Sequence, residues 1–198
     1  MSFLPHHNNM ELAIFRLEDV CVRIQDEMEG FLQTAALEKS AEIEAIFRWL
    51  NKRRIKIALL SDYNRADTEI LLQRLGWRVG EAENIMLVLT DQLTNSDPVR
   101  CVLDLVGLKD GAAVFSVFDT PRLLHLADAN RLKLNLGITN GSCSYVALAG
   151  APHHALLDKL IQLPDFLLRH LYPVSEVPMS RKSLFSRGFF FPLRSFFW

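Results

Sequence analysis

Cysteine is scarce in this sequence, and the three thiols, at Cys21, Cys101 and Cys143, lie far apart along the chain. They form neither a CxxC pair nor the spacing of a zinc site, so the pattern excludes a disulfide framework and a cysteine-based metal centre. We expect three thiols that are buried or half-buried in a reducing compartment.

The chain also lacks an excess of charge and any long hydrophobic run. Its 22 basic and 23 acidic residues give a net charge of -1, which provides no electrostatic case for a nucleic-acid partner. No run approaches the roughly 18 apolar residues that a spanning helix needs. Residues 1–10 contain no basic segment followed by an apolar core, so a secretory signal is not expected. We therefore expect a cytoplasmic protein, and peripheral contact with a membrane stays open.

What the sequence does have is a regular alternation of apolar runs of strand length with helical segments. Its 198 residues, 49% of them hydrophobic, are enough for one α/β domain with a sizeable core. The predicted strands are residues 12–17, 55–60, 85–89, 112–118 and 133–138. The predicted helices are residues 24–37, 38–52, 67–75, 98–106, 121–130 and 158–171, the last broken near Pro164. This order predicts a three-layer α/β/α, Rossmann-like domain with a parallel sheet of about five strands.

We expect that domain to occupy residues 11–172, after a flexible lead-in at residues 1–10 and before a tail at residues 173–198. The tail has no helical or alternating period, and its aromatic surface must be covered by something. It could dock on a protein partner, insert its rings at a membrane interface, or fold back on its own domain. The residues expected to bind a partner are Phe185, Phe189, Phe190, Phe191, Arg194, Phe196, Phe197 and Trp198.

The predicted first strand runs directly into the polar residues Glu18 and Asp19. Open α/β sheets bind their ligands at the carboxyl ends of the strands, so we expect the functional site at this tip. Side chains alternate along a strand, and Asp19 is therefore expected to point away from the side on which Glu18 lies. The turn at residues 137–141, GITNG, could hold an anion on its backbone amides.

Four segments, in this order, resemble motifs of the haloacid dehalogenase superfamily. AIFRLEDVCVR (13–23) is similar to the first motif, IKIALLSDYNR (55–65) to the second, and VFSVFDTPRLL (114–124) to the fourth. Residues 136–167 resemble the end of the phosphonoacetaldehyde-hydrolase-like branch. The resemblance implies a Rossmann-like fold and a phosphatase-type hydrolase with an aspartate nucleophile and a magnesium ion.

The sequence departs from this family pattern at the residues that carry the chemistry. Arg16 stands where the family has its nucleophilic aspartate, Glu18 where it has its second aspartate, and Leu123 where the fourth motif has a further aspartate. Ser61 and Asp119 match the second and fourth motifs. Magnesium prefers several oxygen ligands, so Asp119 beside a guanidinium makes a poor metal site. We therefore expect no cofactor, and magnesium only if the protein is an enzyme.

Other family features have no counterpart in the sequence. No basic residue precedes Pro98 where the third motif would place one, and Arg100 lies inside the predicted helix. The segment between Arg23 and Ser61 is too short for the family's cap module, so we expect a domain without a cap. The branch's Schiff-base lysine would lie on that cap and is missing with it.

We expect Arg16 and Asp119 to form an ion pair where the family holds magnesium, because a buried carboxylate without a cation is costly unless it is paired. Simpler roles also exist: Ser61 and Asp119 could each cap the helix that follows. His153 and His154 are adjacent and do not share a face, so a metal site there is not favoured.

Two functions follow from the resemblance and its departures. The leading hypothesis is a catalytically degenerate hydrolase homologue that serves as an interaction or scaffold subunit through its tail. The alternative is a divergent phosphatase or phosphonate hydrolase that uses Asp119, Ser61 and Glu18.

Overall fold

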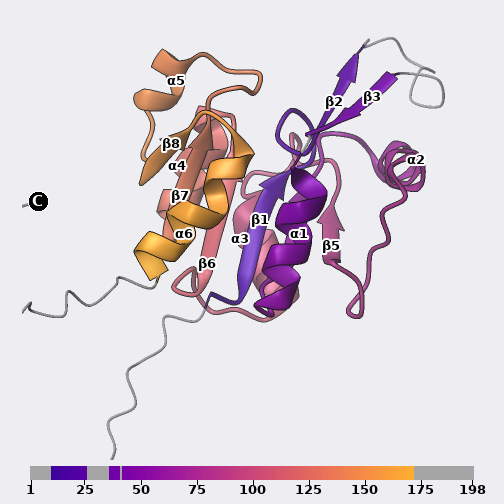
Figure 1. Ribbon diagram of the computed structural model, residues 1–198, viewed down its shortest axis with the longest axis horizontal. Helices are drawn as coiled ribbons and strands as arrows, with labels where there is room; N and C mark the ends of the chain where they lie inside the picture. Colours follow the sequence, from indigo (N-terminus) through magenta and orange to yellow (C-terminus); the bar gives the residue numbers. More distant parts are fainter. Residues whose placement is uncertain (1–9, 26–35, 41, 172–198) are drawn as a thin grey trace, which may run out of the picture.

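The computed structural model describes residues 10–25, 36–40 and 42–171, and these form a three-layer α/β/α domain (Figure 1). The central sheet has six parallel strands in the order β5-β4-β1-β6-β7-β8. Its strands are β1 (Leu12–Arg16), β4 (Lys56–Leu60), β5 (Ile85–Leu89), β6 (Val114–Phe118), β7 (Leu134–Ile138) and β8 (Ala155–Leu157). The predicted fold class is confirmed, and the sheet has one strand, β8, beyond the five that the sequence predicts.

The helices lie on both faces of this sheet, and every residue of β1, β6 and β7 is consequently buried. The helices are α1 (Ile43–Lys52), α2 (Arg65–Leu75), α3 (Pro98–Val106), α4 (Pro121–Ala129), α5 (Tyr145–Ala149) and α6 (Leu163–Leu171), and a 3₁₀ turn, η1 (Leu160–Gln162), precedes α6. In β1, Ala13 and Phe15 belong to the core shared with α1, α2 and α6, whereas Leu12 and Ile14 belong to the core shared with α3, α4 and α5.

A two-stranded antiparallel hairpin, β2 (Val22–Gln25) and β3 (Ala36–Lys39), projects beyond the carboxyl ends of the sheet strands (Figure 1). The predicted helix over residues 24–37 is therefore wrong at both of its ends, and residues 26–35 lie outside the described part. The predicted helix over residues 38–52 is correct from Ile43 onward, because the residues just before it pair in the hairpin. The predicted absence of a cap stays a prediction.

Two helices, α2 and α3, begin at a side-chain cap and end at a glycine. Asn64 accepts a hydrogen bond from the Asp67 N–H at the start of α2, and Gly76 ends that helix with φ +69°. Asp97 caps α3, and Gly107 ends it with φ +78°. Such a backbone conformation is open to glycine without a side-chain penalty. The predicted last helix is broken as expected, into η1 and α6.

The predicted lead-in lies almost wholly, and the predicted tail wholly, outside the described residues, so the docking role of the tail stays a prediction. Within the described ranges, no helix combines the length and the apolar character that a membrane span would require.

The aromatic centre of the core makes the fold testable. Phe15 is fully buried and packs edge-on against Phe47, at 5.7 Å between ring centroids, and against Phe115, at 6.1 Å. We expect Phe15→Ala to lower the free energy of unfolding by about 3–5 kcal/mol, because it leaves a cavity between β1 and α1. Urea unfolding measures the loss, and Leu105→Ala, at a side chain that is 65% exposed, is the control that should change little. A loss in Phe15→Ala as small as that of the control would contradict this packing.

Candidate functional site

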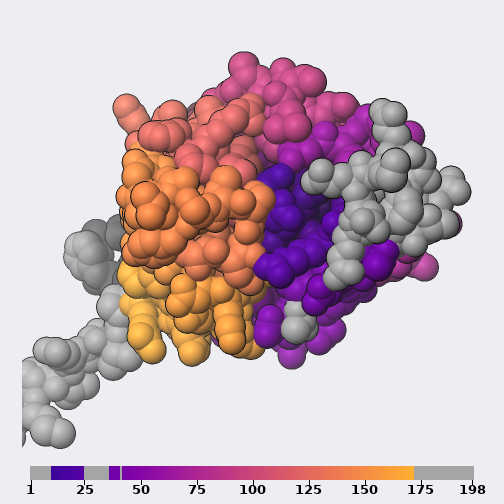
Figure 2. All heavy atoms as spheres, turned by 90° about the horizontal axis from the view of Figure 1, so that it is seen from above, coloured from indigo at the N-terminus to yellow at the C-terminus, as the bar shows by residue number. Residues whose placement is uncertain are grey.

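The carboxyl ends of four sheet strands bring the candidate residues together at one edge of the sheet. Arg16 ends β1, Ser61 follows β4, Asp119 follows β6, and Ser142 lies in the loop after β7. Figure 2 looks onto this end of the molecule, where the indigo segment that contains β1 lies between the orange and purple parts of the chain. These polar residues therefore lie at the predicted edge of the sheet, because parallel strands have their carboxyl ends on the same side.

The predicted ion pair between Arg16 and Asp119 is confirmed. Nη1 of Arg16 lies 2.8 Å from Oδ1 and 3.0 Å from Oδ2 of Asp119. The same guanidinium donates through Nη2 to Oδ2 of Asp62, at 2.5 Å. Asp119 is fully buried and Arg16 is 8% exposed, so each charge depends on the other for compensation.

The electrostatics of Arg16 follow from these contacts. Burial by itself lowers the pKa of Arg16, but the charges and hydrogen bonds of Asp119 and Asp62 outweigh burial and raise that pKa above its ordinary value. The guanidinium is therefore permanently charged. Its Nε is buried and has no hydrogen-bond partner among the described residues.

A loop after β7 completes the surroundings of Asp119. The backbone N–H and the hydroxyl of Ser142 donate to Oδ2 of Asp119, at 2.8 and 2.6 Å. A Cβ on Gly141 would lie 2.3 Å from the Cβ of Asp119, so only glycine lets the loop approach this closely. Residues 137–141 are the turn that the sequence predicts to hold an anion on its backbone amides. The next amide, that of Ser142, instead binds the carboxylate of Asp119. The capping role considered for Asp119 is wrong, because Thr120 is the N-cap residue of α4.

Glu18 and Ser61 form a second buried pair beside the first. The Ser61 hydroxyl donates to Oε1 of Glu18 at 2.7 Å, and the Asp62 N–H donates to Oε2 at 3.1 Å. Burial, the largest effect, raises the pKa of Glu18 to about 7, and the nearby charge of Asp62 acts in the same direction. Ser61 does not cap α2, which has Asn64 as its N-cap residue.

Asp19 contributes to the site, although alternation along the strand predicted that it would point away. β1 ends at Arg16, and Asp19 adopts a left-handed backbone conformation with φ +61°. Its Oδ2 consequently lies 3.4 Å from Nη1 of Arg16. Burial raises the pKa of Asp19, the charge of Arg16 opposes that rise, and Asp119 adds to it.

Three polar residues at the site were missed by sequence reasoning, namely Asp62, Gln92 and Ser142. The Gln92 amide donates to Oδ1 of Asp62, and Nη1 of Arg122 donates to Oε1 of Gln92 at 3.2 Å. Asp62 and Gln92 both come shortly after a strand, and that position is the signal that could have found them. Arg100, considered for the third motif, instead bonds Asp104 and the Lys109 carbonyl on α3 and after it.

The two adjacent histidines lie away from this site and have local partners. Nδ1 of His154 accepts a hydrogen bond from the Asn135 N–H at 3.0 Å, and Nδ1 of His153 lies 2.8 Å from the Ala151 carbonyl. No group of three or more metal-binding side chains suited to an ion is found within the described ranges.

The residues present do not fit the magnesium ion that the resemblance implies. Both carboxylate oxygens of Asp119 are within hydrogen-bond distance of Nη1 of Arg16, and Oδ2 also accepts from Ser142. Leu123, at the position of the family's further aspartate, is buried in the core. A divalent cation would have to displace a guanidinium of like charge to reach Asp119.

Comparison with known proteins identifies the fold. No family model and no curated protein sequence matches the chain. Solved structures do match. The cobalt-bound deoxy-D-mannose-octulosonate 8-phosphate phosphatase of Haemophilus influenzae has a TM-score of 0.62 and 14% identity, over 83% of this chain and 90% of that one. A haloacid dehalogenase-like hydrolase of Streptococcus pneumoniae has a TM-score of 0.62 and 10% identity, over 80% and 98% of the two chains.

The chain has the haloacid-dehalogenase-like fold. A third structure with this fold, the 3-deoxy-D-manno-octulosonate 8-phosphate phosphatase of Moraxella catarrhalis, contains magnesium, phosphate and KDO. It matches with a TM-score of 0.58 and 12% identity, over 82% of this chain and 87% of that one. At such identities the likeness establishes the haloacid-dehalogenase-like fold, while the chemistry has to be argued from the residues of this chain.

The ion pair makes a first prediction for the site. Arg16→Leu should lower the free energy of unfolding by about 3–5 kcal/mol, because it leaves Asp119 buried without a compensating charge. The double variant Arg16→Leu/Asp119→Leu should lose less than the single variant. Urea unfolding of the four proteins of this cycle measures the coupling, and Arg65→Leu, which breaks an exposed pair on α2, is the control. A single variant with the stability of the control would contradict the pairing.

Glu18 predicts a pH dependence. Its folded-state pKa of about 7 lies above the ordinary value of 4.5, so folding favours the protonated form. That stabilisation is fully present below about pH 4.5 and is lost as the pH rises through about 7. Relative to the wild type, Glu18→Gln should therefore gain on the order of 3 kcal/mol between these limits. Urea unfolding over this range tests it, with exposed Glu69→Gln as control, and a difference that stays constant with pH would refute it.

Proposed function

We propose that this protein is a catalytically degenerate homologue of haloacid-dehalogenase-like hydrolases that acts by binding rather than by phosphoryl transfer. The observation that carries the proposal is the position of Nη1 of Arg16, at 2.8 and 3.0 Å from the two oxygens of Asp119. A guanidinium cannot attack phosphorus, and it occupies the place where a metal ion would contact the carboxylate.

The charge balance of the site supports the same proposal. The guanidinium of Arg16 faces the carboxylates of Asp19, Asp62 and Asp119, and the carboxylate of Glu18 accepts from the backbone N–H of Asp62. Phosphoryl transfer needs cations and hydrogen-bond donors directed at the phosphate oxygens. Here the cation is already shared among carboxylates, and an incoming phosphate dianion would meet an excess of negative charge.

The binding role is assigned to the tail at residues 173–198, whose aromatic and basic side chains, from Phe185 to Trp198, suit a groove on a protein partner. A membrane surface and the protein's own domain are the other two surfaces that such a tail could cover. These residues lie outside the described part, so the assignment rests on their composition.

A divergent phosphatase is the second candidate, and it is favoured by the comparisons, since matched structures are named phosphatases and one holds magnesium and phosphate. Glu18 supports it as well. A carboxyl with a pKa of about 7 that is bonded to Ser61 could exchange a proton with a leaving group near neutral pH. This reading would need Arg16 to leave Asp119 so that a metal ion could bind there.

Phosphate release from an aryl phosphate, with and without magnesium, separates the two candidates. We expect no release above that of buffer in either condition, because Arg16 stands where the family has its nucleophile and the described residues assemble no metal site. Magnesium-dependent release that disappears in Asp119→Asn and Ser61→Ala, but persists in Asp104→Asn on the exposed face of α3, would establish the phosphatase instead.

Deletion of residues 183–198 tests the binding role. We expect the full chain to retain a protein partner in a pull-down and the shortened chain to lose it, because the aromatic anchors are removed. Binding of the full chain to anionic vesicles would assign the tail to a membrane. A lower unfolding temperature of the shortened chain, without any change in association, would mean that the tail covers its own domain.

A further inference from the structure

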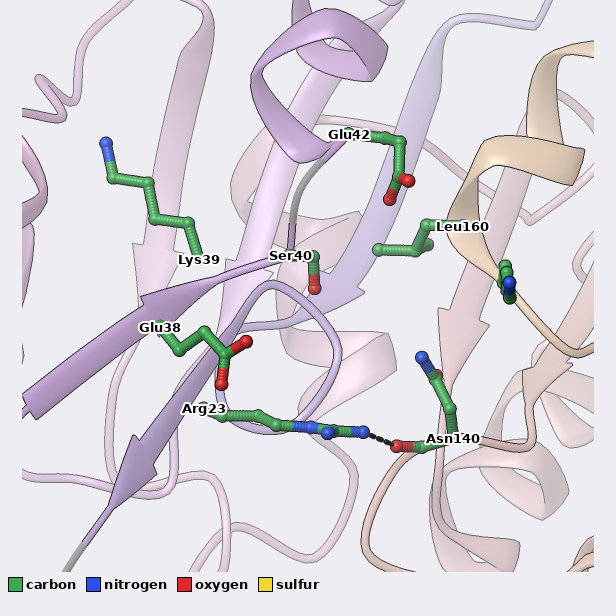
Figure 3. Close-up of a pocket in the computed structure, with 8 residues that line it drawn as sticks. Arg23, Glu38, Lys39, Ser40, Glu42, Asn140 and Leu160 are labelled. Atoms are coloured by element: carbon green, nitrogen blue, oxygen red, sulfur yellow. Dashed lines mark hydrogen bonds between the residues drawn. The ribbon is translucent and has the colours of Figure 1, made fainter.

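A polar cavity of about 280 Å³ lies between the hairpin and the loops that follow β7 and β8 (Figure 3). Arg16 and the residues that it contacts, Asp19, Asp62, Asp119 and Ser142, form the Arg16 site, and none of them lines this cavity. Its walls come from β2 and β3, from the start of α1, and from the segments after β7 and β8, and its polar lining includes Arg23, Glu38, Ser40, Glu42, Asn140 and Lys159.

Some of the charges that line this cavity are already satisfied by the protein. Arg23 donates to the Asn140 carbonyl. Nζ of Lys39 lies 2.8 Å from Oε1 of Glu44 and 2.7 Å from the Leu75 carbonyl, so its charge is turned away from the cavity, as Figure 3 shows. Glu38 also has an interaction partner. These groups make the walls polar, but they already have partners within the protein and do not need a ligand.

Glu42 and Lys159 differ from these residues because their charged groups have no ion-pair partner among the described residues. Glu42 is the N-cap residue of α1, but its side chain makes no capping hydrogen bond, and in Figure 3 its carboxylate points into the cavity between Ser40 and Leu160. Within the described ranges neither the Glu42 carboxylate nor the Lys159 ammonium group is in an ion pair. Glu42 and Lys159 therefore line the same cavity from different walls, and their side chains do not pair with each other.

We propose that this cavity binds a small zwitterion, with its ammonium group at Glu42 and its carboxylate or phosphate group at Lys159. Ser40 donates its hydroxyl proton to the Val20 carbonyl at 2.7 Å, which leaves its oxygen free to accept from the ligand's ammonium group. The side-chain amide of Asn140 supplies a further hydrogen-bonding group, and buried Leu160 forms an apolar contact for the carbon chain.

The wall charges exclude simpler ligands. A plain anion would face the carboxylates of Glu38 and Glu42, and a plain cation would face Arg23 and Lys159, so each would meet repelling charges as well as an attractive one. Asn140 also precedes the Gly141 and Ser142 segment that contacts Asp119, so a bound zwitterion touches the loop that supports the ion pair. The proposal holds whether or not the Arg16 site has catalytic activity.

Amide chemical shifts of the full chain test whether the cavity binds a zwitterion. The probes are 5-aminopentanoate and O-phosphoethanolamine, and pentanoate and pentylamine are the singly charged controls. The zwitterions should shift the amides of Ser40, Asn140 and Lys159, with dissociation constants in the millimolar range. Each control should bind roughly tenfold more weakly, because it lacks one charge-assisted hydrogen bond. The stronger of the two zwitterions identifies the anionic group.

Matched variants localise the binding. Glu42→Gln should bind 5-aminopentanoate no better than pentanoate, and Lys159→Gln should bind it no better than pentylamine, while exposed Glu69→Gln should behave as the wild type. Unchanged unfolding temperatures would show that both variants fold. Absence of any shift up to roughly 20 mM probe, or binding that survives both variants, would overturn the proposal.

Discussion

The buried contact between Arg16 and Asp119 is the interaction on which the carboxyl edge of the sheet depends. Asp119 has no solvent exposure, and its charge is compensated by a guanidinium from the neighbouring strand and by two hydrogen bonds from Ser142. Because Arg16 also reaches Asp62, one side chain joins the ends of β1, β4 and β6, and the loop after β7 joins through Ser142. An aspartate or leucine at position 16 would leave this edge with repelling or uncompensated carboxylates.

Sequence reasoning placed Arg16, Glu18, Ser61 and Asp119 together, since parallel strands deliver their carboxyl ends to one edge. The contribution of Asp19 was missed, because alternation holds only within a strand and the backbone turns left-handed after β1. Ser142 was missed for a similar reason, since loop conformation has no sequence period. The mixed apolar and acidic residues of the hairpin strands fit either period and so predict a helix, and β8, at three residues, is too short to leave a clear pattern.

The fold of this protein resembles that of phosphatases, whereas the residues of its site do not favour phosphoryl transfer. The difference lies in a few side chains. The haloacid-dehalogenase-like fold is shared with solved structures named as phosphatases or as a haloacid dehalogenase-like hydrolase, at identities of 10–14%. The edge of the sheet that would hold a nucleophile and a cation contains a guanidinium bonded to carboxylates instead. The cavity beside the hairpin, where we propose that a zwitterion binds, lies next to this edge.

A crystal structure of the protein grown with magnesium and phosphate tests the central claim most directly. The account predicts that Nη1 of Arg16 stays within hydrogen-bond distance of both Asp119 oxygens, with neither a metal ion nor a phosphate ion at the ends of β1 and β6. A magnesium ion coordinated by Asp119, with the Arg16 side chain swung away from it, would contradict the account.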